Sequence, residues 1–135
     1  MANELYDKGR EGFLDGSIDW DTDDIRCILV DTADYTVDLA AHDNLDDIPA
    51  GARVATSGAL TGKTVAAGVA DADDVTFSAV TGDQSEALVI YKHTGTESTS
   101  RLIAYIDDAT GLPVTPNGGD ITVQFDSAAS KIFKL

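Results

Sequence analysis

The sequence predicts a mainly β fold: a small antiparallel β-sandwich or barrel with one N-terminal helix, forming a single domain over residues 1–135. Two runs rich in β-branched and aromatic residues, 86–92 and 101–107, carry apolar side chains on both faces. Other short apolar runs follow one another along the chain, separated by turns rich in Gly, Asp and Thr. Because only one helical pattern precedes these strands, a βαβ array is not expected.

The helical pattern covers about residues 3–14, with Asn3 as the N-cap and apolar residues at helical spacing. Gly9 and Gly12 fall on its apolar face, where glycine lowers helix stability. Two explanations stay open: close approach of the helix to another backbone, or a marginal helix that becomes ordered only on docking.

A turn over residues 16–20 ends at Trp20, which we interpret as a core anchor, and residues 25–30 form the first predicted strand. Cys27 lies in this strand and is the only cysteine, so no internal disulfide can form. We interpret it as a small core residue, because the chain's two histidines give a catalytic Cys–His pair little support.

The middle of the chain is predicted to be irregular up to a helical turn at 42–48, which Pro49 and Gly51 end. Short strands are expected at 53–57 and 60–67, and a polar turn at 71–74.

The runs 86–92 and 101–107 are predicted to pair as a central hairpin joined by the polar segment 93–100. Strict alternation of apolar and polar residues predicts two half-buried strands, and a last strand is predicted at the C-terminal end of the sequence. These are residues 75–79 with Val75, Phe77 and Ala79 inward, residues 121–125 with Ile121, Val123 and Phe125 inward, and residues 131–135.

The chain is strongly acidic, with 9 Lys and Arg against 24 Asp and Glu and a formal net charge of -15. Such a charge repels phosphate backbones and anionic membrane surfaces, so neither nucleic acid nor membrane is expected as a partner. The first residues lack the pattern of a signal peptide, and no apolar run reaches the length of about 18 residues needed to span a membrane. We therefore expect synthesis in the cytoplasm of the producing cell.

Residues 58–64 imitate a phosphate-binding loop, and Asp31 follows an apolar strand as a magnesium-binding aspartate would. The glycine spacing is one residue short, no helix is expected after Thr64, and the aspartate strand precedes the loop. Nucleotide binding is therefore not expected.

Residues 19–24 resemble the start of a calcium loop, but Asp24 stands where such a loop needs glycine and Val30 where it needs glutamate. A solvated acidic turn is the expected state, and Asp71, Asp73 and Asp74 are interpreted in the same way. No cofactor or metal site is predicted.

No catalytic residue can be nominated, because His42 and His93 have no supporting motif and the sequence has no nucleophile elbow. Nothing in the spacing of the acidic residues selects a catalytic pair. The chain is therefore expected not to be an enzyme.

Residues 5–20, 28–36, 87–92, 100–106 and 111–120 together resemble a family of small virion proteins of tailed bacteriophages. The resemblance covers essentially the whole chain. It implies capsid decoration or cement, in which small proteins, often trimers, sit outside the expanded shell where capsomers meet. The implied partners are the major capsid protein and further copies of this chain, as a homotrimer, and the implied location is the capsid surface of the virion.

An acidic β domain suits this role, because it would not compete for the packaged genome and would stabilise the shell by burying surface between neighbours. Two alternatives remain: a tail, neck or fibre component of the virion, and an acidic protein that mimics nucleic acid and inhibits a host enzyme. The second would need carboxylates at phosphate-like spacing, whereas those of this chain are scattered.

The predicted interface lies in the N-terminal segment, through Leu5, Tyr6, Phe13 and Leu14. Residues 2–16 would lie against a neighbouring subunit or the shell, while the loop 93–100 faces solvent. The alternative is that the helix covers one open end of the β core of its own subunit.

Overall fold

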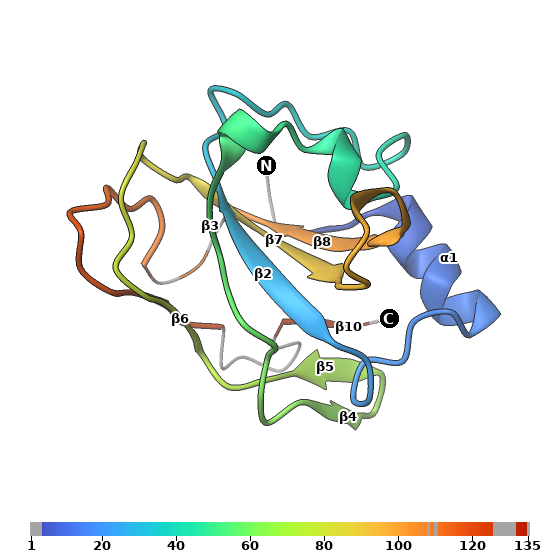
Figure 1. Ribbon diagram of the computed structural model, residues 1–135. Coiled ribbons are helices and arrows are strands. Elements are labelled where there is room, and N and C mark those ends of the chain that lie inside the picture. Colours follow the sequence, from blue (N-terminus) through green and yellow to red (C-terminus); the bar gives the residue numbers. More distant parts are fainter. Residues whose placement is uncertain (1–3, 108, 110, 126–131, 135) are drawn as a thin grey trace.

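The structure is a computed structural model, which describes residues 4–107, 109, 111–125 and 132–134 (Figure 1). It is mainly β, with 34% strand and 15% helix, and the described residues contain one α-helix and three antiparallel sheets. This confirms the predicted fold class, a small β-sandwich with one N-terminal helix. Asn3, the predicted N-cap, lies outside the described residues.

The elements follow one another in mostly short pieces, of which β2 and β7 are the longest strands. In chain order they are β1 (Glu4–Leu5), α1 (Asp7–Asp15), β2 (Ile25–Val30), the 3₁₀ turns η1 (Leu45–Asp47) and η2 (Ala50–Ala52), β3 (Arg53–Thr56), β4 (Thr64–Ala66), β5 (Val69–Asp71), β6 (Val75–Phe77), β7 (Ala87–Lys92), the 3₁₀ turn η3 (Glu97–Thr99), β8 (Leu102–Ile106), β9 (Ile121–Val123) and β10 (Phe133–Lys134).

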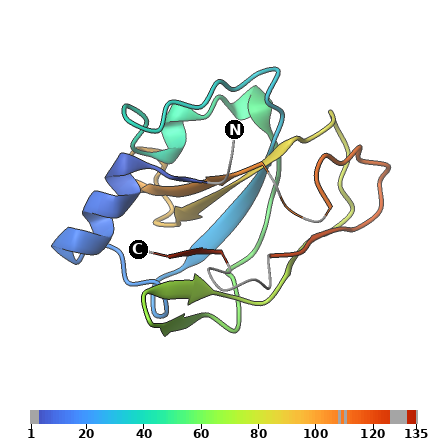
Figure 2. The ribbon, with the colours of Figure 1, turned by 180° about the vertical axis from the view of Figure 1, so that it is seen from behind.

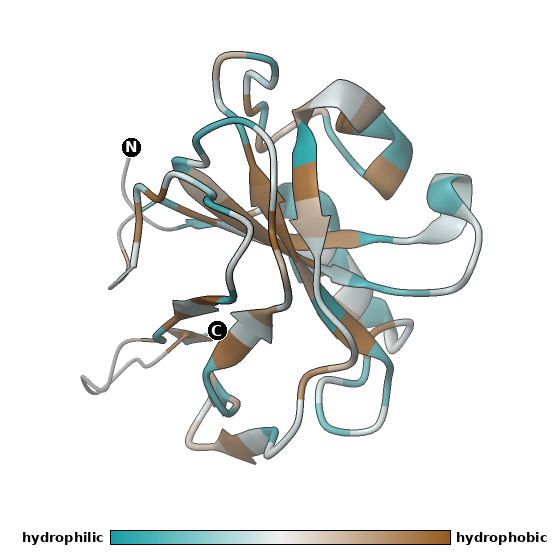
Figure 3. Cartoon of the chain, turned by 60° about the vertical axis from the view of Figure 1, so that its left-hand side comes forward, coloured by the Kyte–Doolittle hydropathy of each residue, from teal (hydrophilic) through white to brown (hydrophobic). Residues whose placement is uncertain are grey.

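The largest sheet has the strand order β1-β8-β7-β2-β3, so β7 lies at its centre. β7 and β8 pair antiparallel, with Leu88 opposite Ile106 and Ile90 opposite Ala104, which confirms the predicted hairpin. The joining segment was predicted to face solvent from residue 93 to 100; residues 94–99 are exposed, whereas Ser100 is buried at 1% exposure. In Figure 3 the apolar colour concentrates on these central strands, whereas the outer loops are mainly polar.

Both faces of the central sheet are buried, because alternate side chains enter two separate clusters. One cluster joins Leu29, Leu88 and Ile90 to the small sheets formed by β10-β5-β4 and β6-β9. The other joins Ile28 and Val89 to the long connection between β2 and β3. Figures 1 and 2 show the small sheets on one side of the central sheet and this connection on the other.

The first difference from the predicted elements is at the N-terminus, where α1 begins at Asp7 rather than near residue 3. Glu4 and Leu5 form β1, which pairs with β8, and the Tyr6 N–H donates to the Ile103 carbonyl at 2.9 Å. Backbone hydrogen bonds to the sheet therefore replace the first helical turn. Leu5, whose spacing from the later apolar residues suggested a longer helix, is instead buried as part of β1.

α1 packs against β8 at Gly9, which is the close backbone approach that the sequence left as one of two explanations. A Cβ at Gly9 would lie 2.8 Å from the Ile103 carbonyl oxygen and 2.9 Å from both the Ile103 Cα and the Leu102 carbonyl oxygen. Gly12 instead faces the side chain of Ile18. The helix ends at Gly16, which adopts a left-handed conformation with φ 81°.

The predicted strand at 60–67 is confirmed only over β4, and Asp71 belongs to β5 rather than to a polar turn. β4 and β5 form a hairpin whose turn residues, Ala67 and Gly68, both have positive φ, 52° and 78°. This pair of positive φ values is the requirement of a type I′ turn, for which alanine gives no sequence signal.

Ala79 was predicted to point inward, and this is wrong: it is exposed, and Val80 is buried instead. Its φ of 49° breaks the alternation after β6. The other inward residues of the two alternating strands are buried, and Phe125 packs partly buried against the core. The predicted helical turn near residue 45 is present as η1, and η2 follows where Pro49 and Gly51 were expected to end it.

Candidate functional site

The segment after α1 folds back over the small sheets and brings Trp20 into the core. The Ile18 N–H donates to the Gly12 carbonyl at 3.0 Å, which directs the chain back along the helix. Trp20 is 4% exposed, and its Nε1 donates to the Asp71 carbonyl of β5 at 3.0 Å. This confirms Trp20 as a core anchor and fixes its ring at the surface end of the core.

An apolar hollow of about 350 Å³ lies beside this ring, between the end of α1, the β4–β5 hairpin and β10. Phe13, Trp20 and Phe133 form one aromatic wall: the ring centroids of Phe13 and Phe133 are 5.6 Å apart, and those of Trp20 and Phe133 are 5.2 Å apart and edge to face. Val65 and Val69 form the wall on the hairpin. We call this feature the aromatic hollow.

Two large apolar side chains are strongly exposed among the residues that the structure describes, and both belong to segments that border the aromatic hollow. Leu14 is 87% exposed and follows Phe13 on α1, and Val65 is 58% exposed and lines the hollow itself. Exposed apolar surface gathered around a concave apolar site is typical of a protein interaction surface.

The four predicted interface residues differ in their exposure to solvent: two are buried and two offer accessible surface. Leu5 and Tyr6 are 5% and 0% exposed and belong to the two buried clusters of this chain, so their side chains are not accessible to a neighbouring protein. Phe13 is partly buried and lines the aromatic hollow, and Leu14 is exposed. The interface stays a prediction, and Phe13 and Leu14 are the two residues that offer surface for it.

The rim of the aromatic hollow carries two exposed carboxylates, Asp19 and Asp21. Hydrogen bonding with Asp19, followed by repulsion from its like charge, raises the pKa of the Asp21 carboxyl. Within the part of the chain that is described, no Lys or Arg nitrogen forms a salt bridge with either carboxylate. The two acidic groups therefore face solvent as a like-charged pair.

The other two carboxylates of this acidic turn are engaged by the chain's own cations. Lys92 forms a salt bridge with Asp23 at 3.2 Å, and Lys63 donates to the Asp23 carbonyl oxygen. Arg26 binds Asp24 through two hydrogen bonds of 3.0 Å, which hold the pKa of the Asp24 carboxyl below its usual range. The carboxylates of residues 19–24 therefore do not converge as calcium ligands would.

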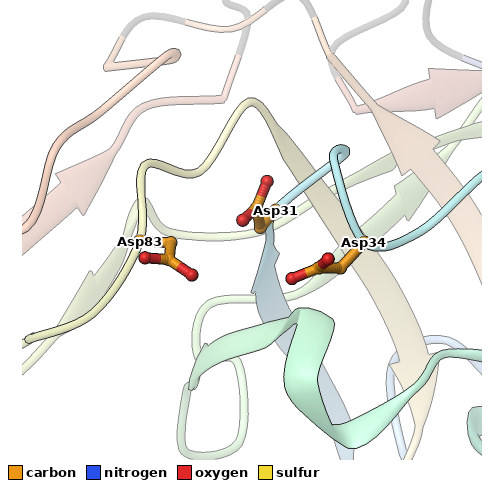
Figure 4. A group of neighbouring side chains, drawn as sticks. All are labelled: Asp31, Asp34 and Asp83. Atoms are coloured by element: carbon orange, nitrogen blue, oxygen red, sulfur yellow. The ribbon is translucent and has the colours of Figure 1, made fainter.

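A different group of carboxylates does converge: Asp31, Asp34 and Asp83 each place an oxygen within 4.8 Å of the others (Figure 4). Asp31 directly follows β2 and is 7% exposed, whereas Asp34 and Asp83 are exposed. Asp31 also accepts a hydrogen bond from the Ala33 N–H at 2.9 Å. Hard cations such as Ca²⁺ and Mg²⁺ bind oxygen ligands of this kind, although exposed acidic groups are common without an ion.

Sequence spacing does not reveal this group, because Asp83 comes from the loop before β7. In a second group, Asp43, Asp46 and Asp47, one carboxylate is already engaged within the chain. The Asp47 carboxylate accepts the backbone N–H groups of Asp43 and Asn44, at 2.7 and 3.3 Å, as part of the cap of η1.

Residues 58–64, which resemble a phosphate-binding loop in sequence, lead into a β-strand. β4, not a helix, follows Lys63, and the Lys63 side chain is bound to the acidic turn. No row of helical N–H groups therefore points at the loop, as phosphate binding of this type would need.

Cys27 and His42, which were weighed as catalytic candidates, are both engaged in the packing and hydrogen bonding of the fold. Cys27 is fully buried in the core, as predicted, and burial raises the pKa of its thiol. His42 Nδ1 lies 2.8 Å from the Tyr35 hydroxyl, which in turn bonds the buried Tyr6 hydroxyl at 2.8 Å. Burial raises the pKa of Tyr35 to about 12, so its hydroxyl stays protonated near neutral pH. No pattern in the sequence predicts this buried hydrogen-bonded chain of hydroxyls.

Among the described residues, no helix is both long and apolar enough to cross a membrane. Comparison with protein-family models gives no match, and comparison with curated proteins gives none either.

Proposed function

We propose that this chain is a non-enzymatic virion protein of a tailed bacteriophage, which binds the outer surface of the capsid and stabilises it as a decoration or cement protein. The resemblance of the whole chain to small virion proteins of such phages motivates the proposal. The observation that carries it is the aromatic hollow, which is lined by the exposed Val65, together with the exposed Leu14 on α1; this is apolar surface suited to contact with another protein.

The fold favours binding of a partner protein at the edges of the molecule rather than on a face of the central sheet. Because both faces of the central sheet are covered by the chain itself, neither face is open for a partner. Stable interfaces bury roughly 1,200–2,000 Å² in total, which for a small protein requires a continuous patch around an apolar centre. The end of the molecule formed by α1, the β4–β5 hairpin and β10 meets this requirement best.

Cementing acts by mass action: a protein that binds the assembled shell but not its free subunits stabilises the shell. This mechanism needs contact area and no catalytic group. We propose that the partners are the major capsid protein and further copies of this chain in a homotrimer, and that the protein resides on the capsid surface of the virion after synthesis in the host cytoplasm.

The test is to purify particles from the producing phage, identify this chain by mass spectrometry and locate it by cryo-electron microscopy. We expect density on the outside of the head, at points where capsomers meet. Particles lacking the protein should release DNA at a lower temperature, and added purified protein should restore the original temperature. Absence from particles would contradict the proposal, and density confined to tail, neck or fibres would favour the alternative virion role.

Oligomeric state is measured separately, by sedimentation of the purified protein and of the protein bound to particles. A trimer on the shell supports the homotrimer proposal. Monomers at every position on the shell would contradict it without affecting the decoration role.

A further inference from the structure

We infer that the aromatic hollow receives a large apolar side chain from a partner protein segment that also carries a basic residue beside it. This inference rests on the proposed function and deepens it, because it names the surface that docks and the chemistry of the segment on the shell. A second copy of this chain is not the expected occupant.

The size of the hollow fits one anchor side chain. Its volume of about 350 Å³ is at the small end of ligand-binding pockets, which begin near 300 Å³. Interface anchors of this kind are single aromatic or aliphatic side chains that fill a preformed pocket.

The hollow is preformed because its walls are held by the core. The Trp20 ring is fixed by its hydrogen bond to Asp71 and packs edge to face on Phe133. Val65 is held by the β4–β5 pairing, opposite Ala70. A preformed pocket binds without first ordering its own side chains, which lowers the entropic cost of binding.

The charge of the rim selects the partner. Asp19 and Asp21 stand at the hollow as a like-charged pair. Of the nearby cations, Lys92 is paired with the Asp23 carboxylate, whereas Lys63 binds the Asp23 carbonyl oxygen and acts on Asp21 through its charge without a salt bridge. A basic group that arrives beside the anchor would meet two carboxylates that have no salt bridge within the described part of the chain.

The same charges argue against a second copy. Two copies that met through this face would bring the Asp19 and Asp21 carboxylates of one copy close to those of the other, which a contact between copies at another face would not do. Like charges placed opposite each other across an interface oppose association, whereas a basic segment lowers the repulsion.

The first test uses particles that lack this protein and measures co-sedimentation of purified variants with them. Val65→Glu places a charge in the hollow, and we expect its affinity to fall about tenfold or more. Thr115→Glu adds the same charge in the exposed loop between β8 and β9, which lies across the molecule from β4 in Figure 1, and should bind like wild type. Equal binding by wild type and Val65→Glu would overturn the inference while the decoration role stands.

The second test separates rim charge from total charge. Asp19→Asn/Asp21→Asn should weaken binding about threefold at low salt and reduce the salt dependence of binding. Asp34→Asn/Asp83→Asn removes the same charge from the acidic group at the other end of β2 and should leave both quantities unchanged. Equal effects of the two double variants would overturn the role of the rim.

The third test does not depend on particles. Trp20 is the only tryptophan and lines the hollow, so its fluorescence and its indole N–H resonance report on occupancy. Acetyl-Lys-Leu-Lys-amide should shift both signals saturably, and acetyl-Glu-Leu-Glu-amide should bind about tenfold more weakly. No shift with either peptide, or equal affinities, would overturn the inference whatever the virion results.

Sedimentation of the free Val65→Glu variant tests whether the aromatic hollow is instead a contact between copies of this chain. Its oligomeric state should match that of wild type. If the substitution dissociates an oligomer, the hollow is a contact between copies and the inference is wrong. A failure of the proposed function would appear differently, as absence of the wild-type protein from particles.

Discussion

Replacing Gly9 by Ala tests how closely α1 approaches β8. In an isolated helix this change stabilises by about 1 kcal/mol, because alanine has the higher helix propensity. In this protein the new Cβ would lie 2.8–2.9 Å from three backbone atoms of Leu102 and Ile103. Ordinary contact begins at 3.4 Å, so the helix must move away from the strand by several tenths of an ångström.

This movement affects more than one contact. The Tyr6 N–H bonds the Ile103 carbonyl, and Arg101 donates to the Lys8 carbonyl at 2.8 Å, so both bonds lengthen if α1 shifts. Inserting a methyl group into a packed interior costs about 1–3 kcal/mol. Because all three close atoms belong to the backbone, the cost should fall in the upper part of this range, about 2–3 kcal/mol. After the gain of about 1 kcal/mol in helix propensity is subtracted, Gly9→Ala should lower the free energy of unfolding by about 1–2 kcal/mol.

The assay is urea unfolding followed by the fluorescence of Trp20, with the slope of the transition compared between variants. Gly12→Ala is the matched control: it gives the same gain in propensity, but its Cβ would lie 2.7 Å from Cγ1 of Ile18 and closer still to Cδ1, which are side-chain atoms that can move without shifting the backbone. It should lose clearly less stability than Gly9→Ala. A Gly9→Ala protein as stable as wild type, or equal losses in both variants, would refute this account of the packing.

Three further predictions concern the core, the buried hydroxyl chain and acid stability. Ile90→Ala and Ile103→Ala should each cost about 2–5 kcal/mol in urea unfolding, and losses under about 1 kcal/mol at both would show that the hairpin is not core. Tyr35→Phe removes the hydroxyl that joins two partners and should cost about 1–3 kcal/mol in thermal unfolding; an unchanged midpoint would contradict the chain. The pKa of Asp24 is lowered in the folded state by Arg26, so its stabilisation is present above the unfolded pKa and lost as pH falls through the folded pKa. Asp24→Asn should therefore be less stable than wild type at neutral pH and equal to it in strong acid, and a deficit independent of pH would argue against the pair.

The longest strands could be predicted because their sequence carries the signal by itself. β2 and β7 are continuous apolar runs, and burial on both faces leaves no polar alternation to confuse them with surface strands. β1 and β5 could not be predicted in the same way. Strands of two or three residues are too short to show a period. β1 exists here because the longer β8 supplies hydrogen bonds, and β5 because it pairs with β4 on one edge and β10 on the other.

The candidate site was predictable only in part. Phe13 and Trp20 stand out in the sequence as large apolar residues near the N-terminus, but their partners in the aromatic hollow come from distant segments: Val65 from the β4–β5 hairpin and Phe133 from β10. The same holds for Asp83, which meets Asp31 only through the fold. Leu5 and Tyr6 have the same apolar character as Phe13, and only the pairing of β1 with β8 determines that they are buried.

Because β7 lies at the centre of the sheet, hydrogen exchange of its backbone amides can report the stability of the whole protein. The strand is hydrogen-bonded to β2 along one edge and to β8 along the other, and a buried cluster covers each face. Solvent deuterium can therefore reach the amides of Val89 and Ile90 only when the whole sheet opens. Their exchange rates should report the global free energy of unfolding, and on intact particles they would measure directly how much stability docking adds to the protein.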